Sequence, residues 1–416
     1  MLTREKLYFS SIILILLEFY VTCFFGTSPT VSYNVTTIVY GESVIDTYVR
    51  YFSQLSITLL FIYISYKFQI KYNSLFLIIF IFILWIMIVP LFVNDNFLTN
   101  VKYVFYLLVI IIGINLFKND RSFIDFNIKM LQIMGLSILF FSIIYIIQFP
   151  VPEYRVYRAS IMHSNANEDA LILAVSFPFL FLLKNRFFKI ILILYYVFFL
   201  VFYNSTRGAI TMSLITILII QYIKYKKNKI LYIIIVLIFF SLSISIINKY
   251  VINDPFFEKG FTAVEENESG NFTQRISGIW IPLIEYTLQK SPILGFGAKK
   301  YGELAENITF VTNENGNIIY MERSPHNFFI MFLFNWGLIG LALLLFIYLK
   351  YFFIAFNIFK KKYDLLSTAV FSSWISFTGM NFISNSFSYR GWSILVILVL
   401  TTHFLKYYKS IYYEYI

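Results

Sequence analysis

The chain has 416 residues, of which 59% are hydrophobic and only 13% are charged, whereas an average soluble domain is about 25% charged. This composition excludes a soluble globular protein and indicates an integral membrane protein. The formal net charge of +11 does not point to a nucleic-acid partner, because lysines concentrated at the ends of apolar segments are typical of membrane orientation.

Apolar segments recur from one end of the chain to the other, and their length suits helices that cross a hydrocarbon layer of roughly 30 Å. They lack the alternation of a β-barrel strand, so we expect an all-α polytopic protein with about twelve transmembrane helices. Residues 1–416 are predicted to form a single integral membrane domain. The predicted spans are 8–26, 52–67, 74–93, 101–117, 126–149, 166–183, 188–204, 208–223, 230–248, 326–349, 366–386 and 391–405.

Basic residues gather in alternate connections between these spans. By the positive-inside rule, these connections and both chain termini lie in the cytoplasm, and the protein is expected in the inner or plasma membrane. The basic positions are Lys67, Lys71, Lys118, Arg121, Lys184, Arg186, Lys189, residues 224–229, residues 360–362, Lys406 and Lys409.

One predicted extracytoplasmic loop, residues 249–325, is much longer than a connection requires. Loops of that length are usually functional or disordered. Within it, the segment TQRISGIWIPLIEYTLQ predicts an amphipathic helix that is bent at Pro282 and lies on the membrane surface or over the bundle. Its apolar positions at helical spacing are Ile276, Ile279, Trp280, Leu283, Ile284 and Leu288. The glycine-rich segment at 295–300 follows no predicted strand, so it indicates a turn and not a nucleotide site.

Arginine and lysine are distributed differently in the predicted topology. Seven of the ten arginines map to the extracytoplasmic side: Arg50, Arg155, Arg158, Arg207, Arg275, Arg323 and Arg390. A guanidinium binds phosphate through a planar fork of donors, so this pattern suggests a phosphorylated ligand. Pairing with the acids of the same loops, or with lipid head groups, is the alternative. Arg207 is the most informative arginine, because it lies in a short hairpin at membrane depth, where a charge is costly.

His326 stands between Pro325 and Asn327 at the outer start of the predicted span 326–349. With an ordinary pKa near 6.5, a histidine can take a proton from an attacking hydroxyl group near neutral pH. A histidine at such a position is also commonly a helix cap or a head-group contact. Asn327 could orient the histidine ring or cap the helix.

Four segments in this order resemble the superfamily of O-antigen ligases and of O-antigen and capsular polysaccharide polymerases. They are HSNANEDALILAVSFPFLFLL at 163–183, NSTRGAI at 204–210, QRISGIWIPLIEYTLQKSPILGFGAKKY at 274–301 and SPHNFFIMFLFNWGLIG at 324–340. The long extracytoplasmic loop before the His-Asn pair is similar too.

The resemblance implies a metal-independent, inverting glycosyltransferase that needs no cofactor. Its donor would be a polyprenyl-diphosphate-linked glycan, its acceptor a second glycan, and its active site would lie on the extracytoplasmic side. Arg207 and Arg275 would hold the diphosphate leaving group, and His326 would be the general base. Further substrate contacts are expected from Arg323, Asn327, Asn165 and Asn167.

The motifs do not separate two activities of this superfamily. A polymerase joins lipid-linked repeats, with a chain-length regulator as a conceivable partner, whereas a ligase moves a finished glycan to another acceptor. We favour the polymerase, because polymerases are the more varied group. A flippase or exporter for lipid-linked sugars is a third alternative. Against it, the predicted spans place few charges at mid-depth apart from Glu18, and no internal repeat is evident.

Overall fold

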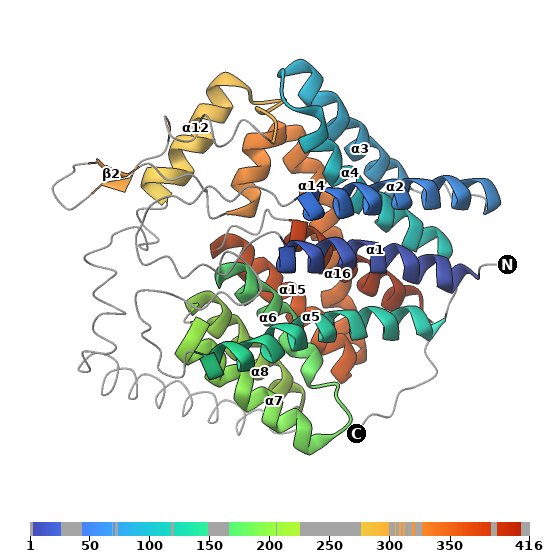
Figure 1. The fold of residues 1–416 in the computed structure, drawn as a ribbon, viewed down its shortest axis with the longest axis vertical. Helices are drawn as coiled ribbons and strands as arrows, with labels where there is room; N and C mark the ends of the chain where they lie inside the picture. Colours follow the sequence, from blue (N-terminus) through green and yellow to red (C-terminus); the bar gives the residue numbers. More distant parts are fainter. Residues whose placement is uncertain are drawn as a thin grey trace.

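The computed structural model describes residues 3–25, 44–68, 70, 74–117, 120–148, 166–204, 206–224, 276–298, 304, 308, 311–312, 318–320, 327–383 and 389–408. These residues form a bundle of long helices (Figure 1). The helices are α1 (Arg4–Phe25), α2 (Val44–Lys67), α3 (Ser74–Phe92), α4 (Phe97–Leu116), α5 (Arg121–Gln148), α6 (Ala166–Leu180), α7 (Arg186–Phe199), α8 (Arg207–Lys224), α12 (Ile281–Lys290), α14 (Phe328–Lys362), α15 (Leu365–Ile383) and α16 (Tyr389–Tyr407).

Helices lie at every predicted span that falls within the described residues, and the ninth span, 230–248, falls outside them. Among the described helices, α3, α4, α14 and most of α5 are long and apolar enough to cross a membrane, judged by length and composition alone. This supports the multi-pass architecture, whereas the total of twelve spans stays a prediction.

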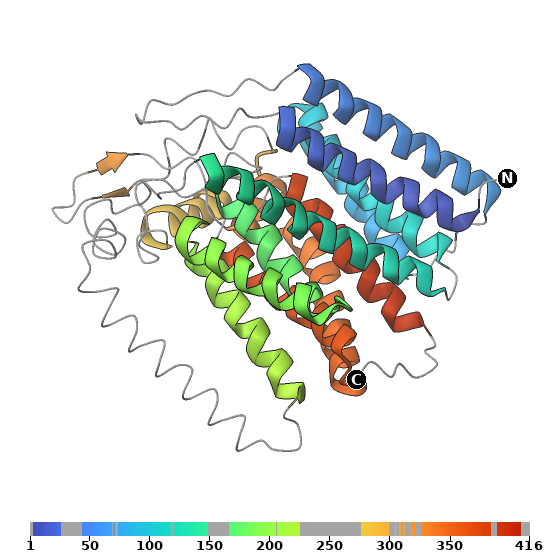
Figure 2. The ribbon, with the colours of Figure 1, turned by 60° about the horizontal axis from the view of Figure 1, so that its bottom comes forward.

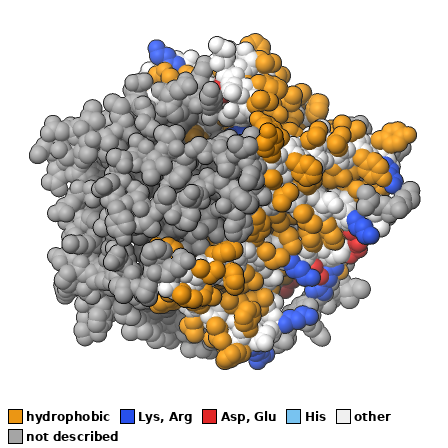
Figure 3. Space-filling model, viewed as in Figure 1, with side chains coloured by type: hydrophobic (Ala, Val, Ile, Leu, Met, Phe, Trp, Pro, Cys, Tyr) orange, Lys and Arg blue, Asp and Glu red, His pale blue; other side chains and the backbone are white. Residues whose placement is uncertain are grey.

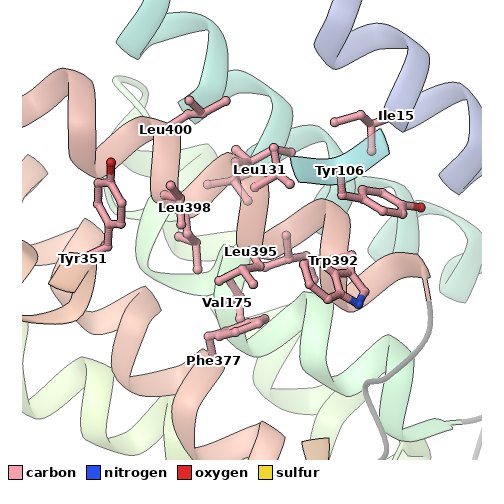
Figure 4. Close-up of a cluster of buried hydrophobic side chains, with 14 of the residues drawn as sticks. Ile15, Tyr106, Leu131, Val175, Tyr351, Phe377, Trp392, Leu395, Leu398 and Leu400 are labelled. Atoms are coloured by element: carbon pink, nitrogen blue, oxygen red, sulfur yellow. The ribbon is translucent and has the colours of Figure 1, made fainter. Parts of the chain in front are cut away.

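Helix α16 lies at the centre of the bundle, with α1–α4 on one side and α5–α8 on the other (Figure 1). From Gly391 to Leu405 its side chains are all buried, as expected for a helix that is apolar on every face. Figure 4 shows Leu395, Leu398 and Leu400 of α16 among side chains from six neighbouring helices, including Ile15 of α1 and Phe377 of α15.

Helix directions can be established from contacts between side chains. The Ser122 hydroxyl donates to Glu5 Oε1 at 2.8 Å, and further along both helices the hydroxyl oxygens of Tyr20 and Ser137 lie 2.9 Å apart. The residue numbers rise together, so α1 and α5 run parallel. In contrast, Tyr348 and Phe359 of α14 contact Phe377 and Phe371 of α15 respectively, so α15 and this part of α14 run antiparallel.

One end of the bundle gathers the basic connections. The Arg4 guanidinium at the start of α1 lies 4.7 Å from the centre of the Phe68 ring just after α2, and Phe117 after α4 stacks on Phe404 near the end of α16. We call this the basic end and the opposite one the outer end; that the basic end faces the cytoplasm stays a prediction.

Figure 2 shows α12 and the two strands at the end away from the start of α1. Figure 3 shows extensive apolar surface with charged side chains mainly toward one edge.

The amphipathic helix predicted in the long loop is confirmed as a π-helical turn, η4 (Ile276–Trp280), followed by α12. The change of helix type comes just before Pro282, which cannot donate a backbone hydrogen bond. Ile279, Leu283 and Thr287 form the buried face, whereas Leu288, predicted on the apolar face, is exposed.

The all-α prediction needs one correction in the same loop. Strands β1 (Val311–Thr312) and β2 (Ile318–Tyr320) form a small antiparallel hairpin with an irregular register. Strands of two or three residues are too short to show the alternation from which strands are predicted.

The prediction of one continuous span over 326–349 is wrong, because α14 is broken. Trp336 and Gly337 have non-helical backbone angles, with φ 64° and ψ −168° at the glycine. The Phe329 and Tyr348 ring centres are only 5.4 Å apart, although 19 residues of straight helix would separate their backbones by about 28 Å. The half-helix 328–335 therefore folds back along the part of α14 that follows Gly337.

The direction of this half-helix follows from its other neighbours. Phe332 contacts Phe82, and one turn further toward the outer end the Trp85 indole donates to the Trp336 carbonyl at 2.9 Å. The half-helix thus rises toward the outer end of the bundle, where α3 ends. Its first residue, Phe328, lies about 12 Å deeper than the break. The expectation that this helix starts at the outer mouth and descends is therefore corrected: the described start of α14 is recessed, while His326 itself lies outside the described residues.

Pairs of cysteines test the fold-back in a Cys23→Ser background, since Cys23 is the chain's one cysteine. Phe329→Cys with Tyr348→Cys should be joined by a short bifunctional thiol reagent, because the fold-back brings the two positions together. Leu338→Cys with Asn357→Cys has the same sequence separation within the unbroken part of α14 and should not be joined. Gel mobility after proteolysis between the two positions measures the yield, and equal yields for both pairs would contradict the fold-back.

Candidate active site

The structure describes some of the predicted site residues. Arg207 is the first residue of α8, Asn167 is the second residue of α6, and Asn327 immediately precedes α14. The side chain of Arg207 is outside the described part of the chain. His326, Arg275, Arg323 and Asn165 are outside it altogether.

Helices α8 and α14 begin beside the end of α15. Phe329, in the first turn of α14, packs on Phe382 with ring centres 5.2 Å apart. One turn earlier on α15, a Cβ atom added to Gly379 would lie 2.4 Å from Met212, which belongs to the second turn of α8. Two helix starts that carry predicted site residues therefore lie beside a single helix end.

Helix α6 begins at the same end of the bundle. Its Phe179 carbonyl accepts a hydrogen bond from Gln132 of α5 at 2.9 Å, and Ser176 lies against Gly135 one turn further along α5. The two helices therefore run antiparallel, so α6 starts at the outer end, where α5 finishes. The N-termini of α6 and α8, which carry partial positive charge, are thus directed to the outer end of the bundle, whereas the recessed N-terminus of the half-helix of α14 points toward the basic end. Glu168 and Asp169 in the first turn of α6 oppose part of this charge.

The backbone of Arg207 lies in a buried hairpin. Helix α7 ends in a π-helical turn, η1 (Leu200–Asn204), and α8 begins three residues later. The residues around the arginine that the structure describes, Tyr203, Asn204, Thr206 and Gly208, are buried. The predicted short hairpin is confirmed. Its described residues are buried, whereas those of a surface turn would be exposed.

A π-helical turn accompanies each predicted diphosphate-binding arginine. η1 ends three residues before Arg207, and η4 begins immediately after Arg275. Such turns are uncommon and occur frequently at functional sites, because the extra residue in the turn redirects neighbouring groups. This irregularity was not predicted, since hydrophobic periodicity does not distinguish one wide turn.

Asn327 caps the buried start of α14. Its Oδ1 atom accepts hydrogen bonds from the backbone N–H groups of Phe329 and Ile330 at 3.0 and 3.2 Å, and the side chain is 3% exposed. Of the two predicted alternatives, the structure supports capping. The cap satisfies two N–H groups that would otherwise lack partners at a recessed helix end. It also fixes the backbone that directly follows His326.

The turn at residues 292–298 fills the break of α14, and we call this arrangement the clasp. The Phe296 N–H donates to the Phe334 carbonyl, and the Gly297 N–H donates to the Asn335 carbonyl, both at 2.9 Å. In the other direction, the Leu338 N–H donates to the Pro292 carbonyl at 2.8 Å. The broken helix thereby obtains partners for groups that an intact helix would pair internally. Unpaired groups would be costly at this depth.

The predicted glycine-rich turn is confirmed, and its glycines explain how closely the clasp packs. Gly295 and Gly297 have φ angles of +70° and +87°, a region that favours glycine. A Cβ atom on Gly295 would lie 2.6 Å from the Gly337 nitrogen, and one on Gly337 would lie 2.0 Å from the Ile293 carbonyl oxygen. A side chain at Gly295 or Gly337 would push the turn away from the break in α14.

Asn100 of α4 ties the clasp to the bundle. Its Oδ1 accepts from the Trp336 indole at 3.1 Å and from the Ala298 N–H at 3.2 Å. Its Nδ2 donates to Asp95 Oδ2 at 2.8 Å and to the Asn96 carbonyl at 2.9 Å. The fully buried amide therefore uses all of its hydrogen-bonding capacity.

Aromatic side chains hold the half-helix from the other side. Trp336 lies 4.4 Å from Phe332 and 5.0 Å from Tyr103 between ring centres, and Trp392 of α16 contacts Phe328, Phe332 and Tyr103. Figure 4 shows Trp392 beside Tyr106 at the start of α16. Because these rings are buried, the half-helix is fixed along its length between α4 and α16.

Among the described residues, no group of three or more His, Cys, Asp or Glu side chains could hold a metal ion. The described site instead offers helix N-termini and the backbones of Arg207 and Asn327. Sequence reasoning missed Asn100, Trp85 and the role of Gly337. A glycine directly after Trp336 inside an apolar helix was the available signal, since an isolated glycine lowers helix stability.

Comparison with known proteins identifies one family. Residues 190–345 match the family model described as O-antigen ligase, Wzy_C, which confirms the predicted resemblance over this part of the chain. The matched region includes α8, the long loop and the clasp. No curated protein matches the chain.

Replacing Gly337 tests the clasp. Gly337→Ala should destabilise the protein by about 2 kcal/mol or more, because alanine is disfavoured at positive φ and its Cβ atom meets a backbone carbonyl. Gly379→Ala is the control, since its Cβ atom would meet only the flexible end of Met212. The midpoint of thermal unfolding in detergent should fall clearly for Gly337→Ala and less for the control. The reverse order would argue against the clasp.

Asn327→Ala should lower stability by about 1 kcal/mol through loss of the cap, and Asn327→Ser should restore most of it. Thermal unfolding measures both changes. If the serine variant were as unstable as the alanine variant, capping would not be the main role of Asn327.

Proposed function

We propose that the protein is a polysaccharide polymerase that joins polyprenyl-diphosphate-linked oligosaccharide repeats on the extracytoplasmic face of the membrane. The match of residues 190–345 to the O-antigen ligase family supports the glycan-transfer chemistry that polymerases and ligases share. The observation that carries the proposal is that this match includes Arg207, Arg275 and His326, the residues with the predicted chemical roles. The enzyme would act on two lipid-linked glycans in the bilayer.

In the proposed reaction, His326 takes the proton of an acceptor hydroxyl group as its oxygen attacks the anomeric carbon of the donor. The bond from that carbon to the diphosphate breaks, and the polyprenyl diphosphate leaves. Arg207 and Arg275 stabilise the negative charge that develops on it. Attack opposite the leaving group inverts the anomeric configuration. The residues present fit this reaction without a metal ion, because the guanidinium groups supply the positive charge.

The recessed start of α14 supports this mechanism. Asn327 is almost completely buried, and the residues around Arg207 are buried as well. Charged groups in such surroundings interact more strongly than in water, so two guanidinium groups there would stabilise the leaving group effectively. A lipid-linked diphosphate could reach such a site from the bilayer.

The second candidate is a ligase, and the description of the matched family favours it. A ligase would use the same donor chemistry with a different acceptor, so the same three residues would serve. A flippase needs no general base and no leaving-group site, and the family match gives no support for it.

Alanine at His326, Arg207 or Arg275 tests the mechanism. Each variant should lower the rate of glycan transfer on the order of 100-fold or more, since each removes a base or a charge that acts in the transition state. Arg186→Ala, an exposed arginine at the basic end, is the matched control and should leave chain length unchanged. Gel analysis of surface polysaccharide gives the measurement. Long chains in all three stably expressed variants would exclude the proposed roles.

The choice between polymerase and ligase needs purified protein with lipid-linked single repeats and no other acceptor. A polymerase should form lipid-linked chains of two or more repeats, detected by mass spectrometry. A protein that stays inactive until a core acceptor is added is a ligase.

A further inference from the structure

The exposed side of α12 lines a hollow of about 410 Å³ that the proposed mechanism does not use. Its lining is Pro282, Glu285, Tyr286, Gln289, Leu304 and Ile308. Glu285 and Gln289 are one helical turn apart, so both side chains project from the same face of α12. Within the described part of the chain, neither side chain makes a hydrogen bond to protein.

The lining favours a particular class of ligand. A carboxylate repels phosphate, and none of the described residues that line the hollow is basic, so these residues do not favour the diphosphate of the donor. A lipid chain would leave Glu285 and Gln289 without partners. A sugar fits both parts of the lining. Its hydroxyl groups can donate to the carboxylate and exchange hydrogen bonds with the amide, and its C–H faces can pack on Pro282 and Leu304.

Two aromatic contacts connect the hollow to the half-helix of α14. The Tyr286 ring lies 5.2 Å from the Phe296 ring, and Phe296 lies 4.9 Å from Phe334, between ring centres. Phe296 also donates its backbone N–H to the Phe334 carbonyl in the clasp. The hollow is therefore tied to the outer end of the half-helix.

We infer that this hollow is a carbohydrate subsite that holds sugar units of the acceptor glycan at some distance from the reacting hydroxyl group. The inference rests on the proposed function for the identity of the glycan. Phe334 and Phe328 are six residues apart on the half-helix, which corresponds to about 9 Å. An acceptor of several sugars can therefore occupy the hollow with one part while another part extends toward the recessed N-terminus that follows His326. The clasp keeps these two regions in a fixed relation.

Kinetics with an acceptor that cannot act as donor test this inference. We would use an alkyl glycoside of the host's repeat unit, which has no diphosphate, together with the lipid-linked donor and the full-length protein in nanodiscs. Glu285→Ala and Gln289→Ala should each raise KM for the glycoside about ten-fold, the effect of losing one or two hydrogen bonds. KM for the donor and kcat at saturating glycoside should stay within about two-fold. Leu288→Ala, exposed on the same helix outside the hollow, is the matched control and should change neither constant.

Binding without turnover separates this inference from the proposed function. The free repeat oligosaccharide, released from its lipid by mild acid, should give a saturation-transfer NMR signal with the wild-type protein and with His326→Ala. With Gln289→Ala the signal should be clearly weaker at the same oligosaccharide concentration. If His326→Ala transfers glycan normally while the hollow variants lose oligosaccharide binding, the mechanism fails and the subsite stands. If the hollow variants bind the oligosaccharide and keep the wild-type KM for the glycoside, the subsite is wrong whatever His326 does.

Discussion

The structure depends on a constraint that any broken helix in a membrane must meet: the backbone groups released at the break need partners. In α14, the break at Trp336 and Gly337 releases carbonyl groups that the turn 292–298 and the Trp85 indole take up. Without these partners the half-helix would be too costly to maintain in a low-dielectric layer. The position of Asn327, the depth of the site and the placement of α12 all follow from this contact.

The candidate site is assembled from the ends of helices and not from their faces. Helices α6, α8 and the half-helix of α14 begin near the end of α15, while the clasp and the rings around Trp392 fix the half-helix from two other directions. Helix N-termini carry partial positive charge, which suits the binding of an anionic group. The buried helix α16 supports the arrangement from the centre of the bundle, so the rigid part of the protein lies directly beneath the part that would hold substrate.

The sequence predicted the helices well because each is a long apolar segment bounded by charged residues. It also predicted the amphipathic helix at 276–290 and the glycine turn that follows it. Hydropathy could not show that α14 reverses direction, because both of its arms are equally apolar and the average along 326–349 does not change at the break. Asn100 could not be singled out either. Its importance arises from Trp336 and Ala298, which are 236 and 198 residues away in the chain and meet it only in the folded bundle.

The fold-back of α14 has a consequence for how the protein is made. An apolar segment needs about 20 residues to be inserted as a helix that crosses the bilayer, and the half-helix has eight. It therefore cannot be inserted as a span by itself and must enter together with the longer arm that follows Gly337. The turn 292–298 leaves the ribosome before either arm, so in the predicted topology it waits for them on the extracytoplasmic side. Closure of the clasp is thus a late event in biogenesis, and the recess at the start of α14 is completed only after the chain as far as α14 has been inserted.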